Sequence, residues 1–390
     1  MRTLKGDQST VRALNRRLIL NTIRQSGPLS RSQLAERTGL SPAAVTGVTA
    51  ELIADGYLLE GSLGEAVVGR PPILLDLNVS AFYAVGLKLM EDRIEAVLTD
   101  LATTVVERAT LTLPDHTPES VAATAARAVD HFMTGGRDRA RLIGTGLGMP
   151  GVIDADSGTC RQSPILGWRD VPIGRMISEA TGAPAWVDND VNAFATAERL
   201  FGRGRNAQSF LTVTFGRGIG AGLVLDGRVY RGTFGGAGEF GHTTSEPGGR
   251  QCECGKHGCL EAYASEPALA ARLAEHSGLP NGGIEGFLAA TSTGDPTALE
   301  LQDDAARRAG IRLADLVNVL NPELVVIGGE GVRLGERFFE ILRDSLAEHA
   351  FDGLADQLPF FVDEWGDDAW ARGAASLAVQ QAFALTGGQD

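Results

Sequence analysis

Residues 238–262 read GEFGHTTSEPGGRQCECGKHGCLEA, and this stretch is the most informative part of the sequence for the fold. Three of the four cysteines in the chain, Cys252, Cys254 and Cys259, fall within eight residues, and His242 lies ten positions before the first of them. Three thiolates and one imidazole complete the tetrahedral shell of Zn²⁺, and a closed shell is typical of a structural site. We therefore predict one structural zinc ion per chain, bound by these four residues.

Two alternatives compete with this interpretation. His257 lies inside the cysteine cluster and could replace His242, but His242 would connect the metal to the neighbouring Glu239 and to the rest of the body. Reduced, unligated thiols are the second alternative, which three cysteines at this spacing make the weaker one. Cys160 stands apart and is expected to be an ordinary thiol, because four cysteines in a cytosolic chain do not indicate a disulfide framework.

The composition indicates a folded protein of more than one domain. The 390 residues include 43% apolar and 22% charged side chains, which excludes a disordered or fibrous chain. At about 100–200 residues per domain, this length predicts two or three domains. No apolar run approaches the ~18 residues of a membrane span, and residues 1–17 lack the apolar core of a signal peptide. We expect a cytoplasmic protein with no membrane partner.

Charge is distributed unevenly along the chain. Residues 1–75 carry nine basic and six acidic side chains, a net charge of +3, whereas the whole chain has a net charge of −14, which leaves −17 for the remainder. A basic head can approach nucleic acid, while an acidic body would repel it. The asymmetry predicts two separate functions for the two parts.

The N-terminal residues 1–78 are predicted to form a winged helix-turn-helix domain. Apolar residues at helical spacing predict a first helix over residues 8–26, followed by a second from the cap Ser30 to Gly39. A third helix begins with the cap Ser41 and a proline at its first position, and two short apolar runs around a glycine-rich tip predict the wing. A three-helix cap used for dimerisation is the alternative, which explains the order of helices, turn and wing less well.

In such a domain the third helix enters the major groove of double-stranded DNA. Its exposed positions are predicted to include Ser41, Ala43 and Thr46, which are small and cannot make bidentate contacts to bases. Arg70, followed by two prolines, could insert into a narrow minor groove. We therefore predict that much of the DNA specificity comes from the wing.

Residues 79–390 are predicted to form a larger α/β body. Short strands followed by a helix, a strand and a helix occur twice, over residues 83–187 and 210–347, and this repetition indicates two related lobes. Ligands of such folds bind in a crevice at the carboxyl ends of the strands.

Three further motifs have residue types suited to that crevice. Residues 187–193, VDNDVNA, place acids and amides at a strand-to-helix junction, where Asp190 could accept hydrogen bonds from a sugar hydroxyl or take its proton; capping of the next helix is the alternative role. Glu239 and His242 are three residues apart and would project on the same side of a helical turn. The glycine-rich residues 214–222 could cradle a phosphate or form a simple tight hairpin.

Taken together, these residues resemble the ROK family of repressors, open reading frames and sugar kinases, over essentially the whole chain. The likeness is greatest to its long members with an N-terminal winged helix, the xylose- and N-acetylglucosamine-responsive repressors. The matching positions are Ser30-Arg31, Leu34-Ala35 and Thr38–Ser41, then Gly69–Pro71, Asn189-Asp190, Gly238-Glu239 with Gly241-His242, the cysteine cluster with Leu260–Ala262, and Val326–Gly329.

The resemblance implies a two-lobed, actin-like and sugar-kinase-like body with a sugar site. It implies that five residues contact sugar hydroxyls: Asn189, Asp190, Glu239, His242 and Glu261. In those family members that are kinases, the residue that corresponds to Asp190 is the base. His242 could bind the metal with one ring nitrogen and face the sugar with the other.

Two departures from the family pattern distinguish regulator from kinase. Family kinases carry Asp-x-Gly-Gly-Thr-Lys in the first hairpin, whereas this sequence has KLMEDR at residues 88–93, with both glycines replaced and two acids that would repel a triphosphate. Ile165 stands where many relatives have Asn, so one polar sugar contact is missing. Arg217 stands where kinases usually have Thr and could itself hold a phosphate.

The sequence thus predicts a DNA-binding transcriptional regulator, a repressor, that responds to a sugar through a non-catalytic body. The alternative is an active ATP-dependent sugar kinase with an appended DNA-binding head, and a ligand-independent repressor is a third possibility. Because a palindromic operator needs two heads, a homodimer or homotetramer is expected.

Overall fold

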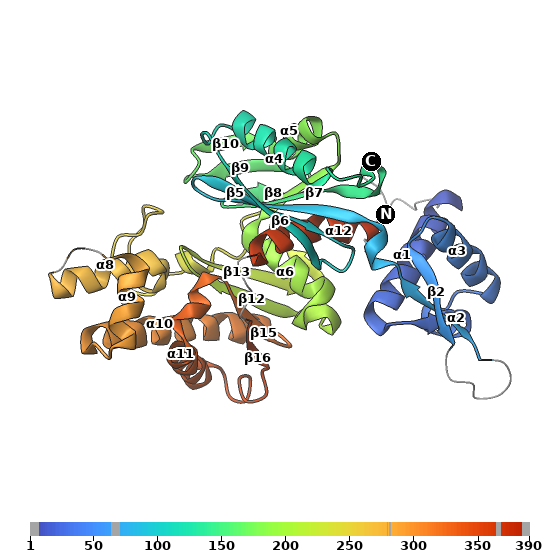
Figure 1. Ribbon diagram of the computed structural model, residues 1–390. Helices are drawn as coiled ribbons and strands as arrows, with labels where there is room; N and C mark the ends of the chain where they lie inside the picture. Colours follow the sequence, from blue (N-terminus) through green and yellow to red (C-terminus); the bar gives the residue numbers. More distant parts are fainter. Residues whose placement is uncertain (1–7, 64–70, 279, 281, 364–367, 384–390) are drawn as a thin grey trace. The chain divides into compact units, whose positions relative to one another are not determined.

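The computed structural model describes residues 8–63, 71–278, 280, 282–363 and 368–383, and the chain divides into two compact units (Figure 1). The first unit comprises Met1–Met149, Pro172–Val187 and Ala374–Asp390, and the second comprises Pro150–Val171 and Asp188–Gly373. Each unit has its own central five-stranded sheet.

The N-terminal part of the first unit has the elements of a winged helix-turn-helix. Its three helices and three strands are α1 (Gln8–Ser26), β1 (Leu29–Ser30), α2 (Arg31–Thr38), α3 (Pro42–Ala54), β2 (Leu58–Leu63) and β3 (Ile73–Leu77). The strands form one antiparallel sheet in the order β1-β3-β2. Ile19, Leu34, Val45 and Leu52 have fully buried side chains and form its core, as their helical spacing predicts.

Local capping fixes where these helices begin and end. The hydroxyl of Ser30 accepts a hydrogen bond from the Gln33 N–H, and the Gln33 side chain bonds back to Ser30, which satisfies two free donors at the start of α2. Gly39 has a φ of 71° and ends the helix in the left-handed conformation that glycine tolerates. Ser41 caps α3, and Pro42 occupies its first turn.

The rest of the first unit is built on a mixed sheet in the order β11-β7-β4-β5-β6. Its strands are β4 (Tyr83–Leu89), β5 (Arg93–Thr99), β6 (Val105–Thr112), β7 (Leu142–Met149) and β11 (Ala185–Asn189), and its helices include α4 (Pro118–Phe132) and α5 (Ile173–Thr181). β4 pairs in parallel with β7 and antiparallel with β5. Gly146 is required on β7 because a Cβ there would collide with the carbonyl of Ala374.

The second unit repeats this plan with the order β14-β13-β12-β15-β16. Its principal elements are α6 (Asp190–Phe201), β12 (Phe210–Phe215), β13 (Ile219–Leu225), β14 (Arg228–Tyr230), α10 (Pro296–Leu320), β15 (Val325–Gly328) and α11 (Glu336–His349). α10 and α11 pack their buried faces, which include Ala305, Ala309 and Phe338, into one core with β12 and β15. The predicted α/β class and the head-plus-body architecture are therefore present.

Several elements of the second unit were not predicted from the sequence. Residues 150–171 contain a small sheet of β8 (Val152–Asp154), β9 (Thr159–Ser163) and β10 (Trp168–Val171). The unpredicted elements elsewhere are α8 (Glu266–Ser277), α9 (Gly283–Ser292), β16 (Phe360–Val362) and α12 (Ala369–Phe383). The strands are only three to five residues long, and TCRQS in β9 lacks the apolar alternation by which a strand is recognised.

The last turn of α12, in the first unit, packs against α1. Phe383 is 3% exposed, its carbonyl accepts a hydrogen bond from the Asn21 side chain, and the Arg24 guanidinium lies 5.6 Å from its ring centre. Over the described residues, no helix combines the length and the apolar character needed to cross a membrane.

The carboxyl of Glu198 on α6 is buried in the second unit, with 1% of the residue exposed. Its Oε2 accepts the N–H of Arg203 at 2.8 Å, while its Oε1 has no hydrogen-bond partner among the described residues. Burial raises the pKa of Glu198 to about 7, because the charges of Arg372 and Arg203 only partly offset the loss of water and the repulsion from Asp363.

We predict that Glu198→Gln stabilises the protein at high pH. A raised pKa means that the folded state loses stability as pH increases from 4.5 to about 7, by a total of about 3 kcal/mol. The gain in Tm of Glu198→Gln over the wild type, followed by calorimetry, should therefore be several degrees larger at pH 8 than at pH 5. Glu300→Gln, at an exposed position of α10, is the control. An equal gain at both pH values would contradict the prediction.

Candidate functional site

The four predicted metal ligands come together in the second unit. Their ligand atoms all lie within 4.8 Å of one another, with His242 Nδ1 3.6 Å from Cys252 Sγ and Cys254 Sγ 3.7 Å from Cys259 Sγ. His242 ends a short 3-10 turn, and the three cysteines lie on the loop that follows. His257, the competing ligand, is exposed and is not part of this group.

Backbone hydrogen bonds and a glycine with positive φ fix the conformation of the loop that carries the three cysteines. Isolated bridges pair Thr244 with Cys259 and Gln251 with His257, and the N–H of Cys252 bonds to the Lys256 carbonyl at 2.8 Å. Gly258 has a φ of 80°, and a Cβ there would collide with a neighbouring carbonyl. The chain thus forms a tight turn that places three sulfur atoms and one ring nitrogen around one point, an arrangement that could bind a metal ion.

Glu239, His242 and Glu261 lie beside this cluster. His242 Nε2 is 3.8 Å from Glu239 Oε2, and His242 Nδ1 is 3.9 Å from Glu261 Oε1. The second oxygen of Glu261 accepts the N–H of Ile219 at 3.0 Å, which attaches the carboxylate to the start of β13. One ring nitrogen of His242 therefore faces the sulfur atoms and the other faces Glu239.

Asn189 and Asp190 lie where β11 ends and α6 begins. The Asn189 side chain caps α6 by accepting the Val191 N–H at 2.9 Å and donates to the Gly151 carbonyl at 3.2 Å. The capping role considered for this motif is thus present. Asp190 Oδ1 also accepts the Val191 N–H, at 2.9 Å.

The pKa of the Glu239 carboxyl depends on its burial and on neighbouring charges. Burial raises the pKa of Glu239, and the charges of Glu261 and Asp190 raise it further, whereas His242 opposes the shift. Asp190, Glu239, Glu261 and His242 therefore share one electrostatic environment. Carboxylates and an imidazole accept and donate hydrogen bonds to the hydroxyls of a neutral polyol, while their combined negative charge disfavours an anionic ligand.

Two loops correspond to the positions where a phosphate could bind. In the second unit, β12 and β13 are joined by the tight turn of residues 216–218, and the carboxylate of Glu330 lies beside Gly216, held by the Trp370 indole N–H at 2.7 Å. In the first unit, β4 and β5 are joined by residues 90–92, where Glu91 and Asp92 are exposed. The first turn thus exposes two acids, whereas the second has Glu330 beside Gly216 and the exposed Arg217 within it.

The predicted DNA-contacting positions on the third helix are exposed. Ser41, Ala43 and Thr46 lie on the surface of α3, although the Ser41 hydroxyl caps the helix and the Thr46 hydroxyl donates to the Pro42 carbonyl at 2.8 Å. Arg70 lies outside the described residues.

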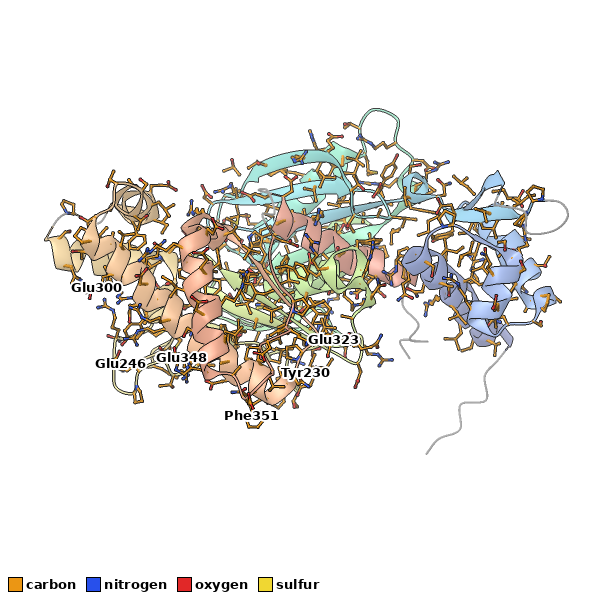
Figure 2. All side chains as sticks on the ribbon, turned by 90° about the horizontal axis from the view of Figure 1, so that it is seen from below. Tyr230, Glu246, Glu300, Glu323, Glu348 and Phe351 are labelled. Carbon is orange, nitrogen blue, oxygen red and sulfur yellow. The ribbon has the colours of Figure 1, made fainter. Side chains whose placement is uncertain are left out.

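Several arginines of the head pair with its acids. Arg12 bonds to Glu51, Arg16 bonds to Asp55 at 2.6 Å, and Arg31 bonds to Glu60 at 2.9 Å. Much of the positive charge counted in the sequence is therefore neutralised within the domain. The second unit, in contrast, has the exposed carboxylates Glu246, Glu300, Glu323 and Glu348 (Figure 2).

Sequence reasoning missed the ion pair between Asp188 and Arg231, which lies next to the Asn189-Asp190 turn. Arg231 donates from Nε at 2.7 Å and from Nη2 at 2.6 Å to one oxygen of Asp188. Asp188 stands in the quoted 187–193 motif, but its partner is 43 residues away and has no local sequence signal.

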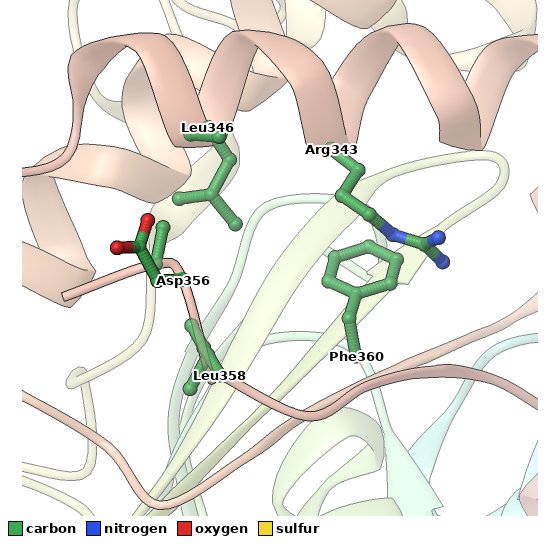
Figure 3. Close-up of a pocket in the computed structure, with 7 residues that line it drawn as sticks. Arg343, Leu346, Asp356, Leu358 and Phe360 are labelled. Carbon is green, nitrogen blue, oxygen red and sulfur yellow. The ribbon is translucent and has the colours of Figure 1, made fainter. Parts of the chain in front are cut away.

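A cavity of about 260 Å³ in the second unit contains none of the predicted site residues (Figure 3). It is lined by side chains of α11 and of the segment that leads into β16, and the Arg343 guanidinium lies 5.0 Å from the centre of the Phe360 ring. This cation–π contact stabilises the wall of the cavity.

Two family models match the chain. The ROK family model matches residues 84–381, and a winged helix-turn-helix DNA-binding model matches residues 12–58. The xylose repressor of Bacillus subtilis is 30% identical over 96% of this chain and 97% of its own length. The predicted resemblance to winged-helix ROK regulators is confirmed.

Solved structures of ROK proteins are similar to this chain as well. A ROK family transcriptional regulator, a homologue of the Escherichia coli MLC protein, superposes with a TM-score of 0.84 at 28% identity, covering 96% of this chain and 98% of its own. A ROK family glucokinase from Streptomyces griseus, in complex with glucose and AMPPNP, has a TM-score of 0.65 at 29% identity and covers 76% of this chain and 99% of its own. The predicted fold class is confirmed.

We predict that the purified chain contains a metal ion that Cys254→Ala loses. Removing one thiolate opens the shell and weakens binding, whereas Cys160, a buried thiol elsewhere in the unit, contributes no ligand. Elemental analysis of protein purified without chelator should find bound metal in the wild type and in Cys160→Ala, and little in Cys254→Ala. Metal at full occupancy in Cys254→Ala would show that the cluster is not the site.

Proposed function

Because the chain belongs to the ROK family, we propose that it is a transcriptional repressor whose affinity for DNA is changed by an unphosphorylated sugar. The observation that carries the proposal is the presence, in one chain, of a winged helix-turn-helix and of a set of carboxylates around His242. Such a set can bind sugar hydroxyls through Asn189, Asp190, Glu239, His242 and Glu261.

The body is proposed to be non-catalytic. The likeness to a glucokinase favours a sugar kinase as the alternative, with Asp190 as its base. The acids in the turn of residues 90–92 and Glu330 beside Gly216 oppose this alternative, because each would repel the phosphates of ATP.

The metal is proposed to be a single structural zinc ion per chain. Three thiolates and one imidazole suit Zn²⁺ and leave no open position for a substrate. Bound zinc would fix the His242 ring through Nδ1 and leave Nε2 directed at Glu239, so the metal would orient one edge of the sugar site.

The proposed partners are double-stranded operator DNA, a sugar and a second copy of the chain. A palindromic operator has two half-sites and therefore needs two heads, which a homodimer or homotetramer supplies. A repressor of this kind acts where the DNA is, so we place it in the cytoplasm. We divide the chain at residue 78, with the head in residues 1–78 and the sugar-binding body in residues 79–390.

We predict that Asp190→Ala abolishes the response to sugar and leaves DNA binding of the sugar-free protein nearly intact. A sugar can shift DNA binding only by its differential affinity for two conformations, typically about 1–3 kcal/mol, or roughly 5- to 150-fold. The ligand is first identified by thermal shift with D-xylose, D-glucose, N-acetylglucosamine and their phosphates. Its effect on operator affinity is then measured in the wild type, Asp190→Ala and the control Asp352→Ala.

Release of DNA by the sugar is the expected sign. A normal response in Asp190→Ala would place the effector site elsewhere. Sugar-dependent formation of ADP in the wild type that disappears in Asp190→Asn would establish the kinase alternative.

We predict that Arg70→Ala weakens operator binding by roughly 1–3 kcal/mol, the scale of one good specific contact, and that Thr46→Ala has a smaller effect. The hydroxyls of Ser41 and Thr46 are already bonded within α3, which leaves little on that helix for base recognition. Gel-shift titration at fixed salt measures both, with Arg175→Ala on the body as the charge-matched control. Unchanged affinity in Arg70→Ala, with a loss in Thr46→Ala, would move recognition to the helix.

A further inference from the structure

The carboxylate of Asp188 is buried in the second unit and is bonded by Arg231, Asn189 and Asn192. The residue is 1% exposed, and its Oδ2 accepts two hydrogen bonds from Arg231, at 2.7 Å from Nε and 2.6 Å from Nη2. Its Oδ1 accepts the backbone N–H of Asn189 at 2.8 Å and the side-chain amide of Asn192 at 3.1 Å. Each oxygen thus accepts two hydrogen bonds, which offset part of the cost of burying the charge; burial still raises the pKa of Asp188.

The two residues of this ion pair lie on the two chain segments that carry Asp190 and Glu239, two members of the proposed sugar site. Asp188 directly precedes Asn189 and Asp190, whereas Arg231 follows β14 and begins the segment that ends in Glu239. That segment is closed by a hydrogen bond from the Ala237 N–H to the Arg231 carbonyl at 3.1 Å. The ion pair therefore joins the segment that carries Asp190 to the one that carries Glu239.

A second contact fixes the far end of the segment. The N–H of Ala221 donates to the Gly238 carbonyl at 2.9 Å, and Gly238, with a φ of 91°, approaches the Ala221 backbone so closely that a Cβ would collide with it. The segment that leads to Glu239 is thus held at both ends, by Asp188 at Arg231 and by β13 at Gly238. The ion pair is a direct hydrogen-bonded connection between this segment and the Asp190 turn.

We propose that Arg231 is a positioning residue of the effector site, which sets the separation of Asp190 and Glu239 without touching the sugar. The proposal rests on the proposed function. A buried ion pair adds little to stability compared with an apolar pair of similar volume, so its retention at this junction is better explained by the geometry that it imposes. The two N–H groups of a guanidinium define a direction, which the ammonium of lysine does not.

The first test measures sugar affinity in the full-length chain by calorimetry, with D-xylose, D-glucose and N-acetylglucosamine as probes. Arg231→Gln should weaken binding by about tenfold or more, within the range of coupling between contacting residues, and Arg231→Lys should restore part of it. Arg228→Gln, at an exposed position of β14 with the same change of charge, should bind as the wild type does. Wild-type affinity in Arg231→Gln would overturn the proposal.

A double variant separates positioning from stability. Arg231→Gln alone leaves a buried carboxylate without its cation and could lower the Tm, whereas Asp188→Asn combined with Arg231→Gln removes both charges. The double variant should recover much of the Tm of the wild type but remain weakened for sugar. Recovery of full affinity together with the Tm would reduce the pair to a structural role and overturn the proposal.

Hydrogen exchange provides a measurement that needs no sugar. Exchange of the Asn189 and Ala237 amides in the sugar-free double variant should be at least several-fold faster than in Arg228→Gln, because both segments lose their shared contact. If none of the three probes binds the wild type, the proposed function fails on its own, and the exchange still decides the role of Arg231. Unchanged exchange at both amides would overturn that role.

Discussion

The imidazole of His242 is the constraint on which the rest of the site depends. Its Nδ1 lies 3.6 Å from the sulfur of Cys252, and its Nε2 lies 3.8 Å from the carboxylate of Glu239. A single rigid ring therefore relates the position of the cysteine cluster to that of the carboxylates proposed to bind sugar. Glu261 reinforces this relation, because one of its oxygens faces the same ring and the other accepts the N–H of Ile219 on β13. A bound metal would fix the ring orientation and would influence ligand recognition without contacting the ligand.

The head and the body differ in net charge. The head has a small net positive charge, and pairs such as Arg16 with Asp55 and Arg31 with Glu60 neutralise part of what its arginines carry. We expect its binding to the DNA backbone to depend on salt. Residues 76–390 carry −17 and expose many carboxylates, which favours neutral ligands and opposes both DNA and nucleotide phosphates.

A shared fold does not determine which of its activities a chain retains. The body resembles a glucokinase as well as a regulator, and two of its turns carry acids that we expect to matter for this choice. Glu91 and Asp92 are exposed on the first of these turns, and Glu330 lies beside Gly216 on the second. These acids are the basis of our proposal that the body binds a sugar without phosphorylating it, so that the sugar acts as a signal.

The sequence by itself determined what short-range rules govern. Ser30, Gly39, Ser41 and Pro42 fixed the helices of the head through capping, apolar spacing fixed its core, and Cys252, Cys254 and Cys259 identified the cluster, because each of these signals lies within a few residues.

Only the tertiary structure decided which distant residues meet. It selected His242 over the nearer His257, built a sheet from the short strands of residues 150–171, and paired Asp188 with Arg231 across 43 residues. Short strands are stabilised by their neighbours rather than by their own composition, and a buried carboxylate takes whichever donor the fold brings to it. The local sequence indicates neither the neighbouring strands nor the donor to a buried carboxylate.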